Sequence, residues 1–117
     1  MPPTGMRYES FVSDLEKAFP ELALHERELQ HLAMGELVLH LKDATSDGAR
    51  FNALADRVLD FIDTAAASDD EYVVNLVAVS FLENLHMLGP ACGQFVQKLG
   101  ARARRARRQV SGPLCGP

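Results

Sequence analysis

The chain has 117 residues, of which 47% are hydrophobic, and it carries 12 lysines and arginines against 16 aspartates and glutamates. This length is enough for one domain with its own core, without a disulfide framework. No apolar run reaches the roughly 18 residues of a membrane span, and the N-terminus lacks the basic and apolar regions of a signal peptide, so we expect neither insertion nor secretion. We therefore expect Cys92 and Cys115 to be reduced thiols in a cytoplasmic protein.

Charge is distributed unevenly along the chain. Residues 1–97 hold all 16 acidic residues and six basic ones, a net charge of −10, whereas residues 98–117 hold the other six basic residues and no acid. An acidic body favours basic protein partners, and a basic segment can bind polyanions. We expect a single helical domain over residues 1–100 and an Arg-rich, disordered or frayed tail over residues 101–117.

The first two predicted helices meet at a proline. Residues 8–19 carry apolar side chains at spacings of three and four, and Pro20 ends this helix because the residue before a proline is pushed out of the helical region. The proline also suits the first turn of a second helix, whose apolar face includes Leu29 and Leu32. Gly35 lowers the helix propensity, so a separate short helix after it is an alternative.

The third predicted helix has a wide apolar stripe over residues 51–65. A turn at residues 45–48 precedes it, and either Ser46 or Asp47 can cap the helix by accepting hydrogen bonds from free backbone amides. The width of the stripe predicts a central position in the fold.

The fourth predicted helix is the most apolar part of the chain. Residues 68–71, Ser-Asp-Asp-Glu, have the sequence of a capping box with the serine as the cap, and Gly89–Pro90 stops the helix. A helix that is apolar nearly all round is buried on several sides, so Phe81 and Leu85 should be almost fully buried. With a short fifth helix over residues 91–99, the pattern predicts an all-α, compact bundle of four main helices plus a short fifth.

Two polar residues, Glu83 and Asn84, interrupt the apolar fourth helix. Burying a carboxylate is costly unless it is paired or hydrogen-bonded. The favoured interpretation makes both structural polar residues, with Glu83 tied to another group of the same chain. The alternative is that Glu83 is an anion at the centre of a partner-binding face.

The sequence contains no catalytic signature, and we expect a non-enzymatic protein without cofactors. Glu28–His31 and Glu83–His86 both have the Glu-x-x-His spacing of diiron bundles, but the acids of the other helices lie on the polar sides of their stripes. We therefore predict no metal site and keep a metal-binding helical bundle as the weaker alternative. A nucleic-acid-associated regulator is a second alternative, with binding only through the charge of the basic tail.

Two stretches of sequence carry a resemblance to a known family. Residues 19–22, Phe-Pro-Glu-Leu, and residues 74–85, which end in Phe-Leu-Glu-Asn-Leu, are similar to those of a small all-helical bacterial family that resembles immunity proteins of polymorphic and contact-dependent toxin systems. The likeness covers residues 8–99 and leaves out the Arg-rich tail. It implies a cytoplasmic protein that binds and neutralises one cognate toxin domain and has no catalysis of its own.

The predicted partner-binding surface is an acidic rim on the third helix and the turn after it. Complementary charge there would speed the encounter with a basic toxin or another basic protein. The alternative is a solvated acidic face that keeps the protein soluble. The rim consists of Asp56, Asp60, Asp63, Asp69, Asp70 and Glu71.

Overall fold

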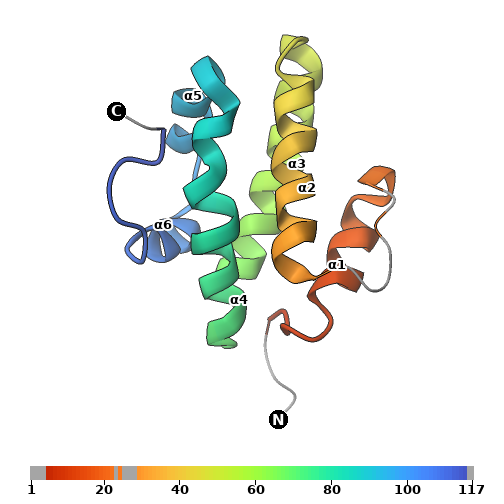
Figure 1. Cartoon of the computed structure of the whole chain (residues 1–117), viewed down its shortest axis with the longest axis vertical. Helices are drawn as coiled ribbons and strands as arrows, with labels where there is room; N and C mark the ends of the chain where they lie inside the picture. Colours follow the sequence, from red (N-terminus) through yellow and green to blue (C-terminus); the bar gives the residue numbers. More distant parts are fainter. Residues whose placement is uncertain (1–4, 23, 25–28, 116–117) are drawn as a thin grey trace.

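The computed structural model describes residues 5–22, 24 and 29–115, and these residues form helices and no strands, which confirms the all-α prediction (Figure 1). Two segments of the chain depart from regular α-helical geometry for more than one turn, both in its C-terminal half. The elements are α1 (Phe11–Ala18), the 3₁₀ turn η1 (Pro20–Leu22), α2 (Gln30–Ala44), α3 (Gly48–Ala66), α4 (Glu71–Leu76), the π-helical η2 (Val77–Phe81), the 3₁₀-helical η3 (Leu82–Ala91), α5 (Cys92–Gln97) and α6 (Ala101–Arg107).

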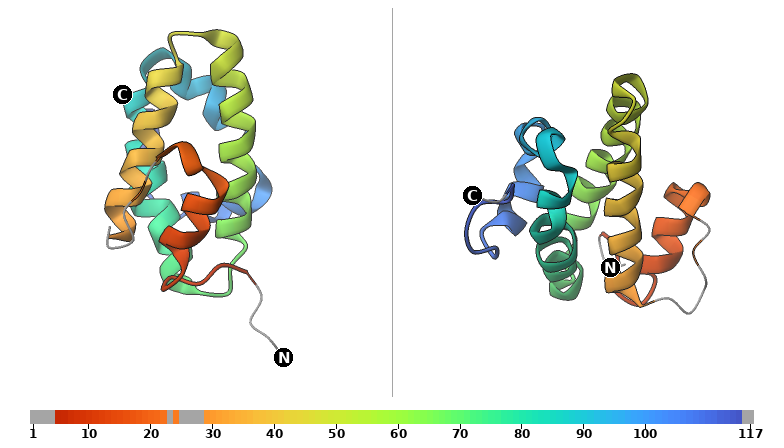
Figure 2. Two further views of the ribbon diagram at one scale, coloured as in Figure 1. Left: turned by 90° about the vertical axis from the view of Figure 1, so that its right-hand side faces the viewer. Right: turned by 45° about the horizontal axis from the view of Figure 1, so that its top comes forward.

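The helices are arranged in layers around the α2–α3 hairpin. α1 lies across one face of this hairpin, and the long helical stretch formed by α4, η2 and η3 packs on the opposite face (Figures 1 and 2). α5 folds back onto η3, and α6 packs against α3. The core lies between these layers, because each helix buries its apolar side against its neighbours.

The first two helices differ in part from the prediction. Pro20 begins only the short turn η1, and α2 starts at Gln30. α2 then continues past Gly35 to Ala44, so the alternative of a separate helix after the glycine is wrong. Leu32, predicted to lie on the buried face, is exposed, because α2 buries the opposite side of its surface.

The Phe-Pro-Glu stretch that follows α1 fastens α1 to α3. Phe19 is buried edge-on against Phe61, with ring centroids 5.7 Å apart, and the guanidinium of Arg57 lies 4.9 Å from the centre of the Phe19 ring. Arg57 Nη1 donates to Glu21 Oε2 at 2.8 Å, and its Nη2 donates to the carbonyl oxygen of Ala18 at 3.0 Å. One arginine of α3 therefore caps the end of α1 and holds the turn after it.

Replacing Arg57 by alanine is expected to lower the free energy of unfolding by about 1–2 kcal/mol, because an ion pair, a hydrogen bond to a helix-terminal carbonyl and a cation–π contact are lost from a partly exposed site. Arg50→Ala is the matched control, because Arg50 is an exposed arginine of the same helix and its guanidinium makes no ion pair within the described residues. Urea unfolding of the two variants measures the difference. Equal losses would contradict the fastening role.

Acid should remove the stabilisation by the ion pair over a defined range. The hydrogen bond from Arg57 lowers the pKa of Glu21 from about 4.5 to about 2. Because this pKa is lower in the folded than in the unfolded chain, the stabilisation is complete above about pH 4.5 and disappears as the pH falls towards 2. The stability difference between the parent and Glu21→Gln should shrink over this range in pH-dependent urea unfolding, and a difference that stays constant would contradict the pairing.

Aspartates cap two of the helices. Asp47, one of the two predicted candidates, accepts hydrogen bonds from the amides of Ala49 and Arg50 at the start of α3. The capping-box prediction for α4 is wrong in its residue, because Asp70 rather than Ser68 is the cap. The Ser68 hydroxyl instead accepts a hydrogen bond from the Asp70 amide and so forms a local turn. A four-residue sequence motif does not distinguish such a turn from a helix cap.

The helical stretch from α4 to η3 is the predicted central element, and its burial confirms the core prediction. Phe81 and Leu85 are fully buried. Gly89, with φ +59°, departs from helical geometry, where the Gly-Pro pair predicted the end of the helix. Among the described residues, the stretch Glu71–Gln97 is long and apolar enough to pass for a membrane span, with a mean hydropathy of 1.2, and half of its apolar window is buried in the fold.

The Arg-rich C-terminal segment is folded, and the prediction of a disordered or frayed tail is wrong. Ala103 and Ala106 of α6 are fully buried, and Leu114 is almost so. The prediction failed because alanines between arginines give a weak apolar signal, although two of them three residues apart share one helix face.

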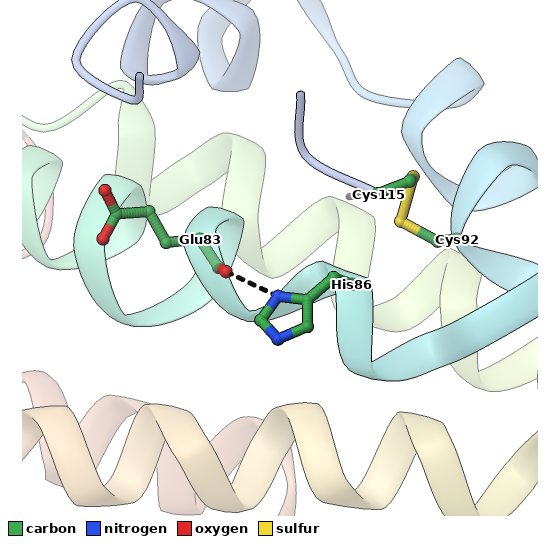
Figure 3. Close-up of a disulfide and its surroundings, with 4 residues drawn as sticks. All are labelled: Glu83, His86, Cys92 and Cys115. Atoms are coloured by element: carbon green, nitrogen blue, oxygen red, sulfur yellow. Dashed lines mark hydrogen bonds between the residues drawn. A yellow bond between two sulfur atoms is a disulfide. The ribbon is translucent and has the colours of Figure 1, made fainter. Parts of the chain in front are cut away.

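The two cysteines form a disulfide, so the prediction of reduced thiols is also wrong. The docking of Leu114 brings Cys115 to Cys92 at the start of α5, and Figure 3 shows this end of the chain beside η3. The Gly- and Pro-rich sequence around Cys115 did not reveal this geometry. Disulfides are rare in reducing compartments, so the two cysteines do not support the predicted cytoplasmic location.

Candidate protein-binding surface

The predicted acidic rim does not form one free surface. Asp70 is used inside the fold, because one of its carboxylate oxygens accepts from the Tyr72 amide at 3.0 Å and the other from the Tyr8 amide at 2.9 Å. Asp69 forms an ion pair with Arg7 at 2.7 Å. These two acids hold the segment before α1 against the α3–α4 turn, a structural role that their clustering in the sequence did not reveal.

The other four acids of the rim differ in their exposure. Asp63 is half-buried beside Gly100, where a Cβ atom would collide with its carboxylate, and its Oδ1 has no hydrogen-bond partner among the described residues. Asp56, Asp60 and Glu71 are exposed. The structure therefore leaves these three as free acids of the predicted rim, on α3 and at the start of α4.

Glu83 is exposed, and the prediction of an internal tie is wrong. At helical spacing it lies on the same side as Val79 and Tyr72, and these two side chains are exposed rather than buried. Among the described residues no hydrogen bond to its carboxylate is formed. Asn84 does act locally, because its Nδ2 donates to the carbonyl oxygen of Ser80 at 2.9 Å.

Glu83→Gln is therefore expected to leave the stability unchanged to within about 0.5 kcal/mol, as for an ordinary surface substitution. Thermal unfolding of the isolated protein measures this. A loss of about 1–3 kcal/mol would instead mean that the carboxylate has a buried partner.

The residues of the two Glu-x-x-His motifs do not converge. Figure 3 shows the Glu83 carboxylate and the His86 ring pointing in different directions, with the His86 Nδ1 atom against the Glu83 carbonyl oxygen at 2.9 Å. His31 contacts the Ser80 hydroxyl, and Glu28 lies outside the described residues. Within the described part of the chain, no group of three or more His, Cys, Asp or Glu side chains is close enough to hold a metal ion.

The most distinctive surface is an apolar one on α2 and the residue before it. Leu29, Leu32 and Leu39 are 64%, 62% and 42% exposed. Their spacing of three and seven residues places them along one side of the helix, opposite the side that packs in the core. Three leucines exposed along one stripe are unusual for a soluble helix and are typical of a contact surface.

A groove of about 240 Å³ runs beside this stripe, between α2 and η3. Leu32 and Leu39 line its α2 side, and Asn84 and Met87 line its η3 side. Gly35 lies between the leucines in the groove wall, and a Cβ atom at this position would meet no atom within 4 Å. We call the three leucines together with this groove the leucine face.

Gly35 is not required by the packing of the fold. A glycine inside a helix costs about 1 kcal/mol relative to alanine, and here the space for a side chain is open. The backbone of α2 is continuous and helical at this position. The absence of a side chain at Gly35 leaves this part of the groove wall open.

The charge at the leucine face is negative. Glu36, an exposed residue of α2, lines the groove. No lysine or arginine is among the described residues that line the groove. The face thus offers apolar contact area with an acidic group beside it, the composition that suits an apolar segment of a basic protein.

Comparison with known proteins identifies the family. No curated protein and no solved structure shows significant similarity to the chain. A family model described as a domain of unknown function, DUF7674, matches residues 12–111, which include α1 to α6 except for the first residue of α1. The chain therefore belongs to the DUF7674 family, a domain of unknown function.

Proposed function

We propose that this protein is a non-catalytic protein-binding module, and specifically an immunity protein that binds and neutralises a cognate bacterial toxin domain. The observation that carries the proposal is the leucine face, where exposed leucines of α2 lie along a groove whose wall is open at Gly35. The resemblance of the Phe-Pro-Glu-Leu and Phe-Leu-Glu-Asn-Leu stretches to immunity proteins supplies the kind of partner.

The occupant of the leucine face is an apolar segment of a cationic partner. Residues 1–97 carry 16 acids and six basic residues, and Glu36 has no basic side chain beside it in the groove lining. A second copy of the same chain would bring two Glu36 carboxylates together, which is unfavourable. The charge therefore favours a basic partner over self-association.

The exposed rim acids have a secondary part in this proposal. Asp56 and Asp60 lie on α3, outside the groove lining, so they act on the partner through long-range charge rather than contact. Such charges mainly change the association rate and its dependence on salt. The leucine face supplies the affinity, because buried apolar anchors carry most of the binding free energy in protein interfaces.

Co-expression with the product of the adjacent upstream gene tests the proposal. We expect a stable complex and relief of that protein's toxicity by the parent chain. Leu32→Asp should abolish both while the fold is kept, because Leu32 is 62% exposed and its replacement leaves the core intact. The proposal would be overturned if the parent chain gave neither a complex nor relief of toxicity, or if Leu32→Asp kept full activity. It would also be overturned if the parent chain formed a dimer that Leu32→Asp made monomeric, because a second copy would then occupy the face.

A further inference from the structure

The folded C-terminal segment creates a second hollow, separate from the leucine face. Its volume is about 310 Å³, and it is lined by Arg104, Arg107, Arg108, Val110 and Gly112. We call it the arginine hollow. Three guanidinium side chains and no acidic residue line it among the described residues.

The first of these arginines is held in place by the backbone. Arg104 Nε donates to the carbonyl oxygen of Leu99 at 3.0 Å, and its Nη2 donates to that of Gln97 at 3.4 Å. These two bonds turn the guanidinium towards the end of α5 and fix its orientation. A guanidinium that is already fixed loses less conformational entropy when it binds a ligand.

Arg107 is the last residue of α6 and lies three residues after Arg104, on the same side of the helix, and Arg108 follows it in the turn after α6. Ala103 and Ala106 bury the opposite side of this helix. The three cations therefore project from a docked helix and the turn after it rather than from a mobile tail.

The opposite wall of the hollow is built by the return of the chain. Gly112, with φ +80°, makes a turn that residues with a side chain rarely adopt. Beyond it, Leu114 is buried and the disulfide joins Cys115 to Cys92. The returning segment is therefore anchored by α6 at its start and by Leu114 and the disulfide at its end.

The charge of the hollow is not compensated within the described chain. The ion pairs of the described residues involve Arg7, His40 and Arg57, and none involves Arg104, Arg107 or Arg108. Three like charges in one hollow repel one another, and a bound anion relieves this repulsion. Planar guanidinium groups match phosphate oxygens through paired hydrogen bonds, and a phosphate group has enough oxygens to accept from more than one arginine.

We propose that the arginine hollow is a phosphate-binding site, in which Arg104, Arg107 and Arg108 donate hydrogen bonds to a phosphate monoester or diester group. The site is independent of the proposed partner face, since it lies on α6 and the segment after it, outside the α2–η3 groove. The phosphate belongs either to a free anion or to the backbone of a nucleic acid, because both present the same oxygens.

Binding of two probes to the purified full chain tests the site. The probes are pyrophosphate, followed by calorimetry, and a fluorescent single-stranded oligodeoxynucleotide, followed by anisotropy over a range of salt concentrations. The test variant is Arg107→Gln/Arg108→Gln, and both positions are exposed, so the fold should be kept. The matched control is Lys42→Gln/Arg50→Gln, which removes the same charge from exposed positions around the α2–α3 turn.

We expect the test variant to bind at least one probe at least tenfold more weakly than the control does. For the oligonucleotide, the loss of two phosphate contacts should also reduce the slope of log K against log salt by about 1.4, since each contact to a single strand contributes about 0.7. Loss of pyrophosphate binding identifies a free phosphate anion, and loss of oligonucleotide binding alone identifies a phosphodiester chain. Binding of neither probe, or equal effects of the two variants, would overturn the proposal.

Discussion

Phe81→Ala is expected to lower the free energy of unfolding by about 3–5 kcal/mol, enough to threaten a domain of ordinary stability. The Phe81 side chain is fully buried at the end of η2, and its ring centroid lies 5.9 Å from that of Phe95 in α5. Its removal leaves a cavity between the central helical stretch and the helix that folds back onto it. The loss combines the transfer free energy of the ring with the cost of the cavity.

Val79→Ala is the control for this prediction, because Val79 belongs to the same π-helical segment but is exposed. We expect it to cost less than about 1 kcal/mol. Urea unfolding of both variants gives the comparison. A Phe81→Ala protein with the stability of the parent would mean that the core is not where the structure places it.

Ala106→Asp should be the second most destabilising substitution. It should lower the free energy of unfolding by about 3–5 kcal/mol, or by the free energy of docking of α6 if that is smaller. Ala106 is fully buried in the hydrophobic core. Burying a carboxylate there is prohibitive, so the variant must release α6 from α3. We expect a lower melting temperature together with new protease cleavage after the arginines of α6.

Ala101→Asp is the matched control in the same helix. Ala101 is exposed and is the first residue of α6, where a negative charge is favourable. It should leave the melting temperature unchanged or slightly raised. If the two aspartate variants behaved alike, the segment after residue 100 would be frayed, as the sequence alone had predicted.

The helices and the core were predictable because their signals are local. Apolar residues at helical spacing predicted α1, α3 and the stretch that contains Phe81, and the Gly89–Pro90 pair predicted the interruption of the helix before α5. The all-α class follows from the same periodicity. The departures of η2 and η3 from regular α-helical geometry have no counterpart in this pattern.

What the sequence could not predict depends on tertiary contacts. Glu83 was expected to be buried because its helix is apolar all round, and only the packing shows which side remains exposed. The cluster of acids in the sequence predicts that Asp70 belongs to the exposed acidic rim, yet both its carboxylate oxygens accept hydrogen bonds from backbone amides. The disulfide depends on the docking of a Gly- and Pro-rich segment that has no periodicity.

The candidate site was missed for a related reason. Leu29 and Leu32 have the spacing of core residues, and α2 carries apolar residues on two sides, so the sequence did not show which side is exposed. One signal was present in the sequence. Gly35 stands inside a helix that it weakens, and a glycine of this kind points to a close approach or a binding surface when packing does not require it.

Gly35→Leu tests whether the groove of the leucine face binds the partner, because it fills the groove without disturbing the core. The position is open to a side chain, and leucine is the better helix former, so the melting temperature should stay the same or rise. Affinity is measured by calorimetry against the product of the adjacent upstream gene, with Asp56→Asn/Asp60→Asn as the comparison. We expect Gly35→Leu to lower the affinity about 100-fold or more, and the rim variant to lower it less than about tenfold. Unchanged affinity of Gly35→Leu, with a large loss in the rim variant, would contradict binding at the leucine face.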